Sequence, residues 1–305
     1  MKAFIDSLKR LHIYFKEMYP IPSRLALGAI VFLEMHFIVS LNQGFTDFKF
    51  GIQEVICAFT VFSFLCWLRI ADDFKDYELD CRLFAHRPLP SGRVHKKDLK
   101  IFATILIAFT LIINLIFMNN FIFCLILYTY GSLMAVWFFQ KHKIAKSLPL
   151  ALVTHNPVQL ILNLYVISFT VIKYDLQWFT LTNFMALFTL YFPALIWEVT
   201  RKIRAPKDET EYVTYSKLFG YKKSVNFAMI VTWIDIITNF ILVWSLNKIS
   251  VAILFILVSW MTYIFFDFKK DPTRYKLVDK VEKYTYLQES TMILTVIVYL
   301  IFGKI

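Results

Sequence analysis

The acidic stretch that ends the second long apolar run of the chain reads Asp72-Asp73-Phe74-Lys75-Asp76-Tyr77-Glu78-Leu79-Asp80, and Arg87-Pro88-Leu89-Pro90-Ser91-Gly92 follows closely. On a helix, Asp72, Asp76 and Asp80 share one face because they are four residues apart. Carboxylates stacked in this way repel one another unless a cation lies among them. Oxygen ligands with room for water suit Mg²⁺, which in turn suits a diphosphate. The stretch therefore predicts a metal site formed by these three aspartates, and the alternative is a solvated acidic helix end.

The rest of the chain is dominated by long apolar segments. Of its residues, 58% are hydrophobic and 18% are aromatic. A helix needs roughly 20 apolar residues to cross a bilayer, and segments of about this length recur along the sequence. We therefore predict an all-α, polytopic integral membrane bundle of nine transmembrane helices, near residues 22–42, 52–70, 100–118, 120–139, 148–171, 178–198, 224–246, 249–267 and 285–302.

The positive charges predict the orientation of this bundle. Of the 33 lysines and arginines, 29 lie in 1–24, 69–100, 141–146, 201–223 and 269–283, which fall on one side of the predicted membrane. By the positive-inside rule, the N-terminus and the loops 71–99 and 199–223 are cytoplasmic. We expect a multi-pass protein of a bacterial inner membrane. The net charge of +11 then reflects topology, and we expect no nucleic-acid partner because no binding motif accompanies it.

Residues 1–20 differ from the rest of the chain. Phe4, Leu8, Leu11, Phe15 and Met18 form an apolar stripe at helical spacing, and charged residues occupy the other positions. This pattern is typical of an amphipathic helix that lies in the membrane interface. We therefore divide the chain into an interfacial helix at 1–20 and a transmembrane domain at 21–305.

Residues 72–92 resemble the first aspartate-rich motif of the UbiA superfamily of intramembrane prenyltransferases, which reads NDxxDxxxD and is followed by an RPLPSG-like turn. Asp72 replaces the usual asparagine, while Asp73, Asp76 and Asp80 fit the pattern. The predicted spans, with loops after the second and sixth, also match. The resemblance implies transfer of a prenyl group from a prenyl diphosphate to a lipophilic or aromatic acceptor in the bilayer, with Mg²⁺. It implies catalytic roles for these four aspartates and contact of Arg87 with the diphosphate.

The second acidic motif of this superfamily is degenerate here. The favoured register puts Lys202, Ala205 and Glu209 where acidic residues are expected, and only Glu209 is acidic. Glu198 and Glu209 are our candidates for a second acidic site, and Asp208 and Glu211 are the other carboxylates within reach. Three basic residues could hold the diphosphate in place of a second metal, or could be ordinary anchors at a cytoplasmic helix end; they are Arg201, Lys202 and Arg204.

Several polar residues lie within the predicted spans. Glu34 in the first span and Asp235 in the seventh sit near mid-membrane, and Asn156 lies in the fifth. An ionisable residue at membrane depth indicates a functional site or a paired structural group. We expect Glu34 and Asp235 to face the bundle interior and, with Asn156, to bind the acceptor. Arg24, at the start of the first span, is a weaker candidate for substrate contact.

Two other functions remain open from the sequence. The same fold could transfer a phosphoribosyl-type group to a polyprenyl phosphate, which the basic stretch 201–207 would suit. A non-catalytic transporter or scaffold is the third possibility. Against a transporter, the acidic residues cluster at one face, and no inverted repeat of broken helices is evident.

Overall fold

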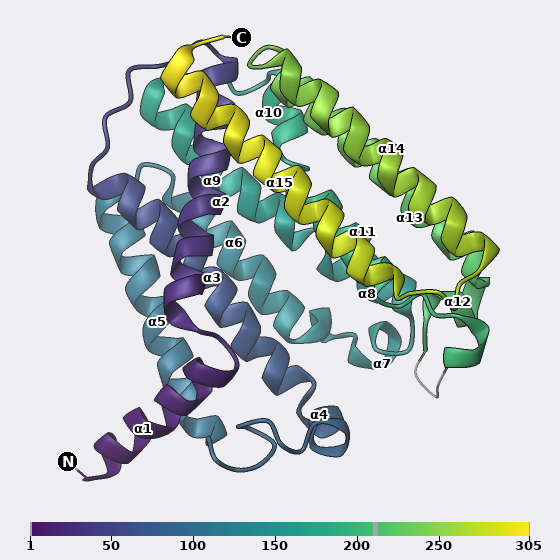
Figure 1. The fold of residues 1–305 in the computed structure, drawn as a ribbon. Coiled ribbons are helices and arrows are strands. Elements are labelled where there is room, and N and C mark those ends of the chain that lie inside the picture. The colour runs from purple at the N-terminus through teal and green to yellow at the C-terminus, as the bar shows by residue number, and fades with distance from the viewer. Residues whose placement is uncertain (1, 210–212, 305) are drawn as a thin grey trace. The chain divides into compact units, whose positions relative to one another are not determined.

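The computed structural model describes residues 2–209 and 213–304, and among these residues it contains helices and no strand (Figure 1). Eight helical segments of the described residues are long and apolar enough to cross a membrane. This confirms the all-helical membrane architecture expected from the sequence. The eight are α2 (Ile21–Asn42), α3 (Ile52–Lys75), α5 (Lys96–Phe117), α8 (Leu148–His155) with α9 (Val158–Tyr174), α10 (Leu181–Ala186) with α11 (Tyr191–Thr200), α13 (Tyr221–Trp244), α14 (Lys248–Lys270) and α15 (Leu277–Phe302).

The remaining predicted span, at 120–139, forms a shorter helix. Helix α6 (Phe121–Ala135) has 15 residues, which corresponds to roughly 22 Å at 1.5 Å per residue, less than the ~30 Å of a hydrocarbon core. After α6 the backbone turns left-handed at Trp137, Phe138 and Phe139, which form the short helix η1 (Trp137–Phe139). The predicted number of nine spans is therefore not confirmed.

Two of the apolar segments are interrupted. Helices α8 and α9 are separated at Asn156 and Pro157, where the proline has no backbone N–H to donate. Helices α10 and α11 are separated at residues 187–190. The remaining helices of the described residues are α1 (Lys2–Glu17), α4 (Tyr77–Leu83), α7 (Lys141–Ile144), η2 (Pro206–Asp208) and α12 (Tyr215–Phe219).

The outer face of α5 shows why this fold suits a bilayer. Ile101, Ile105, Phe109, Ile112 and Ile116 are each about half exposed and recur every three or four residues along the helix. A continuous apolar row of this length is unfavourable in water and favourable against acyl chains.

The chain divides into two compact units, one of residues 1–33 and 49–141 and the other of residues 34–48 and 142–305. In the first unit, α3 packs against both α5 and α6. Gly131 on α6 allows the close approach, because a Cβ atom there would collide with the rings of Trp67 and Phe64. Polar side chains also join the three helices: Ser63 is hydrogen bonded to Thr110 at 2.7 Å and to Tyr128 at 3.0 Å.

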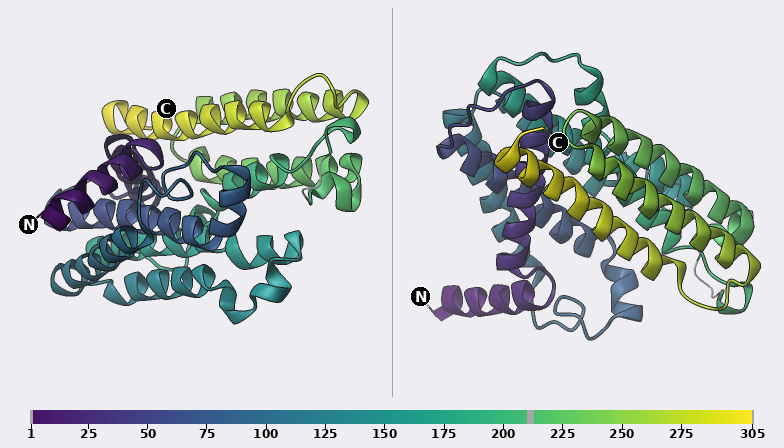
Figure 2. Two further views of the ribbon diagram at one scale, coloured as in Figure 1. Left: turned by 90° about the horizontal axis from the view of Figure 1, so that it is seen from below. Right: turned by 45° about the horizontal axis from the view of Figure 1, so that its top comes forward.

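The second unit is built around long helices. Helix α14 packs between α13 and α15, and α11 contacts both α13 and α15, so that α13, α14 and α15 lie side by side (Figures 1 and 2). Asn247 begins α14 as a cap, because its side-chain oxygen accepts hydrogen bonds from Ile249 and Ser250. Such caps satisfy backbone donors that would otherwise be unpaired at a helix start.

Candidate active site

The aspartate-rich stretch forms the bent junction between α3 and α4 in the first unit. Asp76 lies between the two helices with φ −97° and ψ 8°. The backbone hydrogen bonds continue through the bend, from Asp76 N–H to Asp72 C=O at 2.9 Å and from Asp80 N–H to Asp76 C=O at 2.9 Å. The four-residue spacing is therefore kept along the backbone, but the bend at Asp76 changes where the side chains point.

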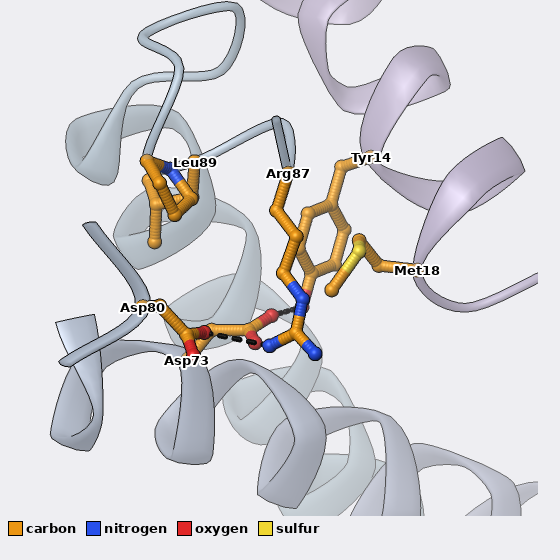
Figure 3. Close-up of a pocket in the computed structure, with 7 residues that line it drawn as sticks. Tyr14, Met18, Asp73, Asp80, Arg87 and Leu89 are labelled. Carbon is orange, nitrogen blue, oxygen red and sulfur yellow. Dashed lines mark hydrogen bonds and ion pairs between the residues drawn. The ribbon is translucent and has the colours of Figure 1, made fainter. Parts of the chain in front are cut away.

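Asp73 is the most tightly held of these aspartates. The Tyr14 hydroxyl of α1 donates to Asp73 at 2.6 Å, and Arg69, one helical turn earlier, forms an ion pair with it at 2.8 Å. Asp73 is 5% exposed, and Figure 3 shows its carboxyl pointing toward Tyr14. Burial, and then the adjacent Asp73, raise the pKa of the Tyr14 hydroxyl. Tyr14 therefore remains a hydrogen-bond donor at physiological pH.

Asp80 lies beside Asp73 and is paired with Arg87. The Arg87 guanidinium donates to Asp80 at 2.9 Å, and its carbon lies 4.0 Å from the centre of the Phe84 ring. The turn that carries Arg87 is fixed by a hydrogen bond from Ser91 N–H to Arg87 C=O at 3.0 Å. Gly92 ends the turn at φ +76°, a conformation that favours glycine.

Together these residues line a recess in the first unit (Figure 3). The side chains fill it so closely that no space for a water molecule remains. A ligand can occupy this recess only if some of these side chains move. The lining residues are Tyr14, Met18, Asp73, Asp80, Arg87, Leu89 and Pro90.

The three aspartates predicted to hold a metal are not gathered in this structure. Asp72 is 48% exposed and pairs with Lys75 at 3.3 Å, Asp76 is exposed, and Asp80 points into the recess. Among the described residues, no three His, Cys, Asp or Glu side chains are arranged to hold a metal ion. The donors are nonetheless all hard oxygen atoms on one short segment, which is the chemistry that Mg²⁺ prefers. The predicted ligand set remains a prediction.

Helix α1 is held by polar contacts to Arg93 and to the start of α5 in the first unit. Asp98 at the start of α5 accepts a hydrogen bond from Ser7 at 2.7 Å and forms an ion pair with Arg10. Arg93 pairs with Glu17 through two hydrogen bonds and holds the pKa of that carboxyl below its usual range. These contacts hold α1 in the position where Tyr14 reaches Asp73. The amphipathic pattern of residues 1–20 does not predict contacts of α1 with Asp98 or Arg93. Arg69 could have been found from its position four residues before Asp73.

The second candidate motif lies in the second unit, where basic residues gather on one acid. Glu198 forms ion pairs with Arg201 at 2.6 Å and with Lys202 at 2.7 Å. Arg201 also lies over the Trp197 ring, at 4.9 Å from its centre. Glu198 thus pairs with two of the three cations predicted to contact diphosphate, Arg201 and Lys202, and is not an isolated carboxylate.

Glu209 has a different environment from Glu198. It accepts hydrogen bonds from the hydroxyls of Thr214 and Ser216, and the Ser216 oxygen accepts from the Arg204 backbone N–H at 2.9 Å. Glu209 therefore helps to close the loop between α11 and α12. Glu211 lies outside the described residues.

A cavity of about 530 Å³ opens beside this loop within the second unit, and its size is within the range of small-molecule sites. Its charged lining is mostly basic: Arg201, Arg204 and Lys276 face one acid, Asp208. Such a lining favours an anionic group.

The other residues predicted to bind substrate have separate environments. Arg24 is exposed and lies over the Tyr19 ring, at 5.6 Å from its centre. Asn156 donates to the Tyr191 carbonyl at 3.4 Å. Glu34 is 6% exposed and Asp235 is fully buried.

Comparisons with known proteins agree with this architecture. A family model described as the UbiA prenyltransferase family matches residues 43–280. A solved structure described as "Structural and mechanistic insights into the biosynthesis of Digeranylgeranylglyceryl phosphate synthase in membranes" has a TM-score of 0.67 and 19% sequence identity, with 96% of this chain and 99% of the other covered. At this identity the likeness shows a shared fold. No curated protein sequence matches the chain.

Proposed function

Because the chain belongs to the UbiA prenyltransferase family, we propose that this membrane prenyltransferase takes its prenyl group from a prenyl diphosphate, uses Mg²⁺, and transfers the group to a lipophilic or aromatic acceptor. The observation that carries the proposal is the pairing of Asp80 with Arg87 beside the buried Asp73. It combines carboxylates that suit a metal with a cation that suits a diphosphate.

The reaction breaks the bond between the first prenyl carbon and the diphosphate oxygen, and the electron pair leaves with the diphosphate. A new bond forms between that carbon and the acceptor, which releases a proton. Mg²⁺, when bound, would stabilise the negative charge of the leaving diphosphate. Asp72, Asp76 and Asp80 are the residues proposed to hold it.

The protein's own residues support this reaction in several ways. Tyr14 and Arg69 fix Asp73, so that the end of α3 keeps its position. Arg87 can exchange its bond to Asp80 for charge-assisted hydrogen bonds to a diphosphate. In the second unit, Glu198 orients Arg201 and Lys202, which we propose contact the diphosphate in place of a second acidic motif.

The distribution of lysine and arginine supports a cytoplasmic position for the loops 71–99 and 199–223. A cysteine placed at His95, which is exposed in the loop before α5, tests this orientation. We expect it to resist an impermeant thiol reagent in intact cells and to react in inverted vesicles. If the cysteine reacts in intact cells, the predicted orientation is wrong and this loop lies outside the cell.

Turnover by purified protein tests the function. The full chain is placed in vesicles of a total bacterial lipid extract, which supplies the acceptor, and is given geranyl, farnesyl or geranylgeranyl diphosphate with Mg²⁺ or with a chelator. We expect Mg²⁺-dependent diphosphate release and a lipid product heavier by one prenyl group. Phosphoribosyl diphosphate is supplied in a parallel assay, and diphosphate release from it, with none from the three prenyl donors, would favour the other transferase instead.

A further inference from the structure

A group of buried polar side chains lies within the apolar helices of the second unit, and we call it the buried carboxyl cluster. Its members come from the second half of α2, from α13 and from α15. Four of them are completely buried, Glu34 is 6% exposed, and Glu289 is partly buried. The cluster consists of Glu34, Asp235, Asn239, Tyr284, Gln288 and Glu289.

Hydrogen bonds join five members of the cluster in two groups. Gln288 donates to one oxygen of Asp235 at 2.8 Å, and Asn239 donates to the other at 3.3 Å. Glu34 and Glu289 are joined by a hydrogen bond between their carboxyl groups, which requires a proton on one of them. Among the described residues, Asp235 is thus hydrogen bonded to two amides, and Glu34 is paired with Glu289. No lysine or arginine in the described part of the chain forms an ion pair with these three carboxyls.

The cluster also contains polar atoms for which the described residues provide no hydrogen-bond partner. The amide oxygens of Asn239 and Gln288 and the Tyr284 hydroxyl are buried in this condition. A buried polar atom without a partner is costly, and three in one place indicate that a further group completes them. The amide oxygens of Asn239 and Gln288 can only accept hydrogen bonds, so that group must be a donor.

The arrangement also restricts the chemistry of that group. Among the described residues, no three carboxylates are placed to hold a metal ion. A hydroxyl group fits better, because it can donate to a carboxyl or amide oxygen and accept from Tyr284. The helices that carry the cluster are apolar and present apolar outer faces, so a ligand would arrive from the lipid phase.

We propose that the buried carboxyl cluster binds the hydroxyl-bearing end of a lipid-soluble molecule. The molecule is either the prenyl acceptor, in which case the inference rests on the proposed function, or a membrane lipid that is not consumed. Both sources share the same recognition chemistry. The cluster extends the sequence prediction for Glu34 and Asp235 by adding three residues that the sequence alone did not single out, namely Tyr284, Gln288 and Glu289.

Binding of a matched pair of ligands tests the proposal without turnover. The full chain is placed in phosphatidylcholine vesicles, which lack hydroxyl donors, and titrated with dodecanol or with dodecyl methyl ether, while tryptophan fluorescence reports binding. We expect the ether, which cannot donate, to bind about tenfold more weakly, as the loss of a hydrogen bond to a charged acceptor predicts. Equal binding of the two compounds would overturn the proposal.

Two variants locate this binding at the cluster. Tyr284→Phe removes a hydroxyl that the described residues leave without a partner, so we expect unchanged thermal stability and about tenfold weaker binding of dodecanol. Glu289→Gln should weaken binding similarly. Thr295→Val is the control, because Thr295 lies on the same helix and already bonds to Ser250 at 2.6 Å; it should bind dodecanol like the parent. Parent-like binding by both Tyr284→Phe and Glu289→Gln would also overturn the proposal.

Addition of farnesyl diphosphate separates the two sources of the ligand. Prenylation of bound dodecanol would identify the cluster as part of the acceptor site, whereas binding without prenylation would identify a lipid site. Loss of diphosphate release with binding intact would count against the proposed function alone.

Discussion

The acidic and basic stretches that follow the second and sixth apolar segments carry opposite charge balances. In the first unit, each of Asp72, Asp73 and Asp80 has its own cation, namely Lys75, Arg69 and Arg87. In the second unit, the single acid Glu198 holds both Arg201 and Lys202. The first stretch has a fourth aspartate, Asp76, so its carboxylates outnumber these cations, whereas in the second stretch two cations share one acid. We therefore propose metal binding for the first stretch and direct anion binding for the second.

The largest expected effect comes from removing metal ligands in the first stretch. Asp76→Asn and Asp80→Asn should each lower Mg²⁺-dependent turnover by about a hundredfold or more, because a neutral amide stabilises the metal far less than a carboxylate. Expression and thermal stability should stay near those of the parent. Diphosphate release at saturating donor is the measurement. Activity of both variants equal to that of the parent would remove the metal site from this stretch.

A smaller effect is expected for the cation that occupies the recess. Arg87→Gln should raise the KM for the prenyl diphosphate by about tenfold or more, since a charge-assisted hydrogen bond contributes ~1.5–3 kcal/mol. Arg82→Gln is the matched control, because Arg82 is exposed on α4 and does not line the recess. If both variants raise the KM equally, the effect is one of overall charge and Arg87 has no specific role.

A still smaller effect is expected where α1 meets the first stretch. Tyr14→Phe removes the donor to Asp73 and should destabilise the protein by about 1–2 kcal/mol, with turnover reduced less than tenfold. Thermal unfolding in detergent and the Mg²⁺ concentration for half-maximal activity report the two effects. Tyr286→Phe, at an exposed position, provides the control. An unchanged stability of Tyr14→Phe would mean that α1 does not support Asp73.

The smallest effect should arise in the second stretch. Glu198→Gln removes the carboxylate but leaves Arg201 and Lys202, so the donor KM should change by less than about threefold, consistent with the modest strength of partly exposed ion pairs. A fall in kcat comparable to that of Asp80→Asn would instead make Glu198 part of a second acidic site. Steady-state kinetics of the two variants side by side decide between these roles.

The apolar segments allowed most of the fold to be predicted, because transmembrane helices need long apolar runs. The break at Pro157 carries its own sequence signal, whereas the early end of α6 at Ala135 does not. The shared face expected for Asp72, Asp76 and Asp80 depends on a straight helix, and after the bend at Asp76 the side chain of Asp80 lines the recess beside Asp73 instead.

The contacts that could not be predicted from the sequence join residues that lie far apart in the chain. Tyr14 reaches Asp73 across 59 residues of sequence, and Gln288 reaches Asp235 across 53. Neither pair has a spacing that local periodicity reveals. Glu289 lies in an apolar helix as Glu34 does, but its pairing with Glu34 depends on how α2 and α15 are arranged within the second unit.

Metal-dependent binding of a donor analogue tests the central claim most directly. Farnesyl thiodiphosphate reacts slowly, so its binding to the purified full chain can be measured by calorimetry with Mg²⁺ and with a chelator. The account predicts tight binding by the parent that requires Mg²⁺, and loss of the Mg²⁺ requirement together with most of the affinity in Asp80→Asn. Equal affinity of parent and variant, with or without Mg²⁺, would contradict it.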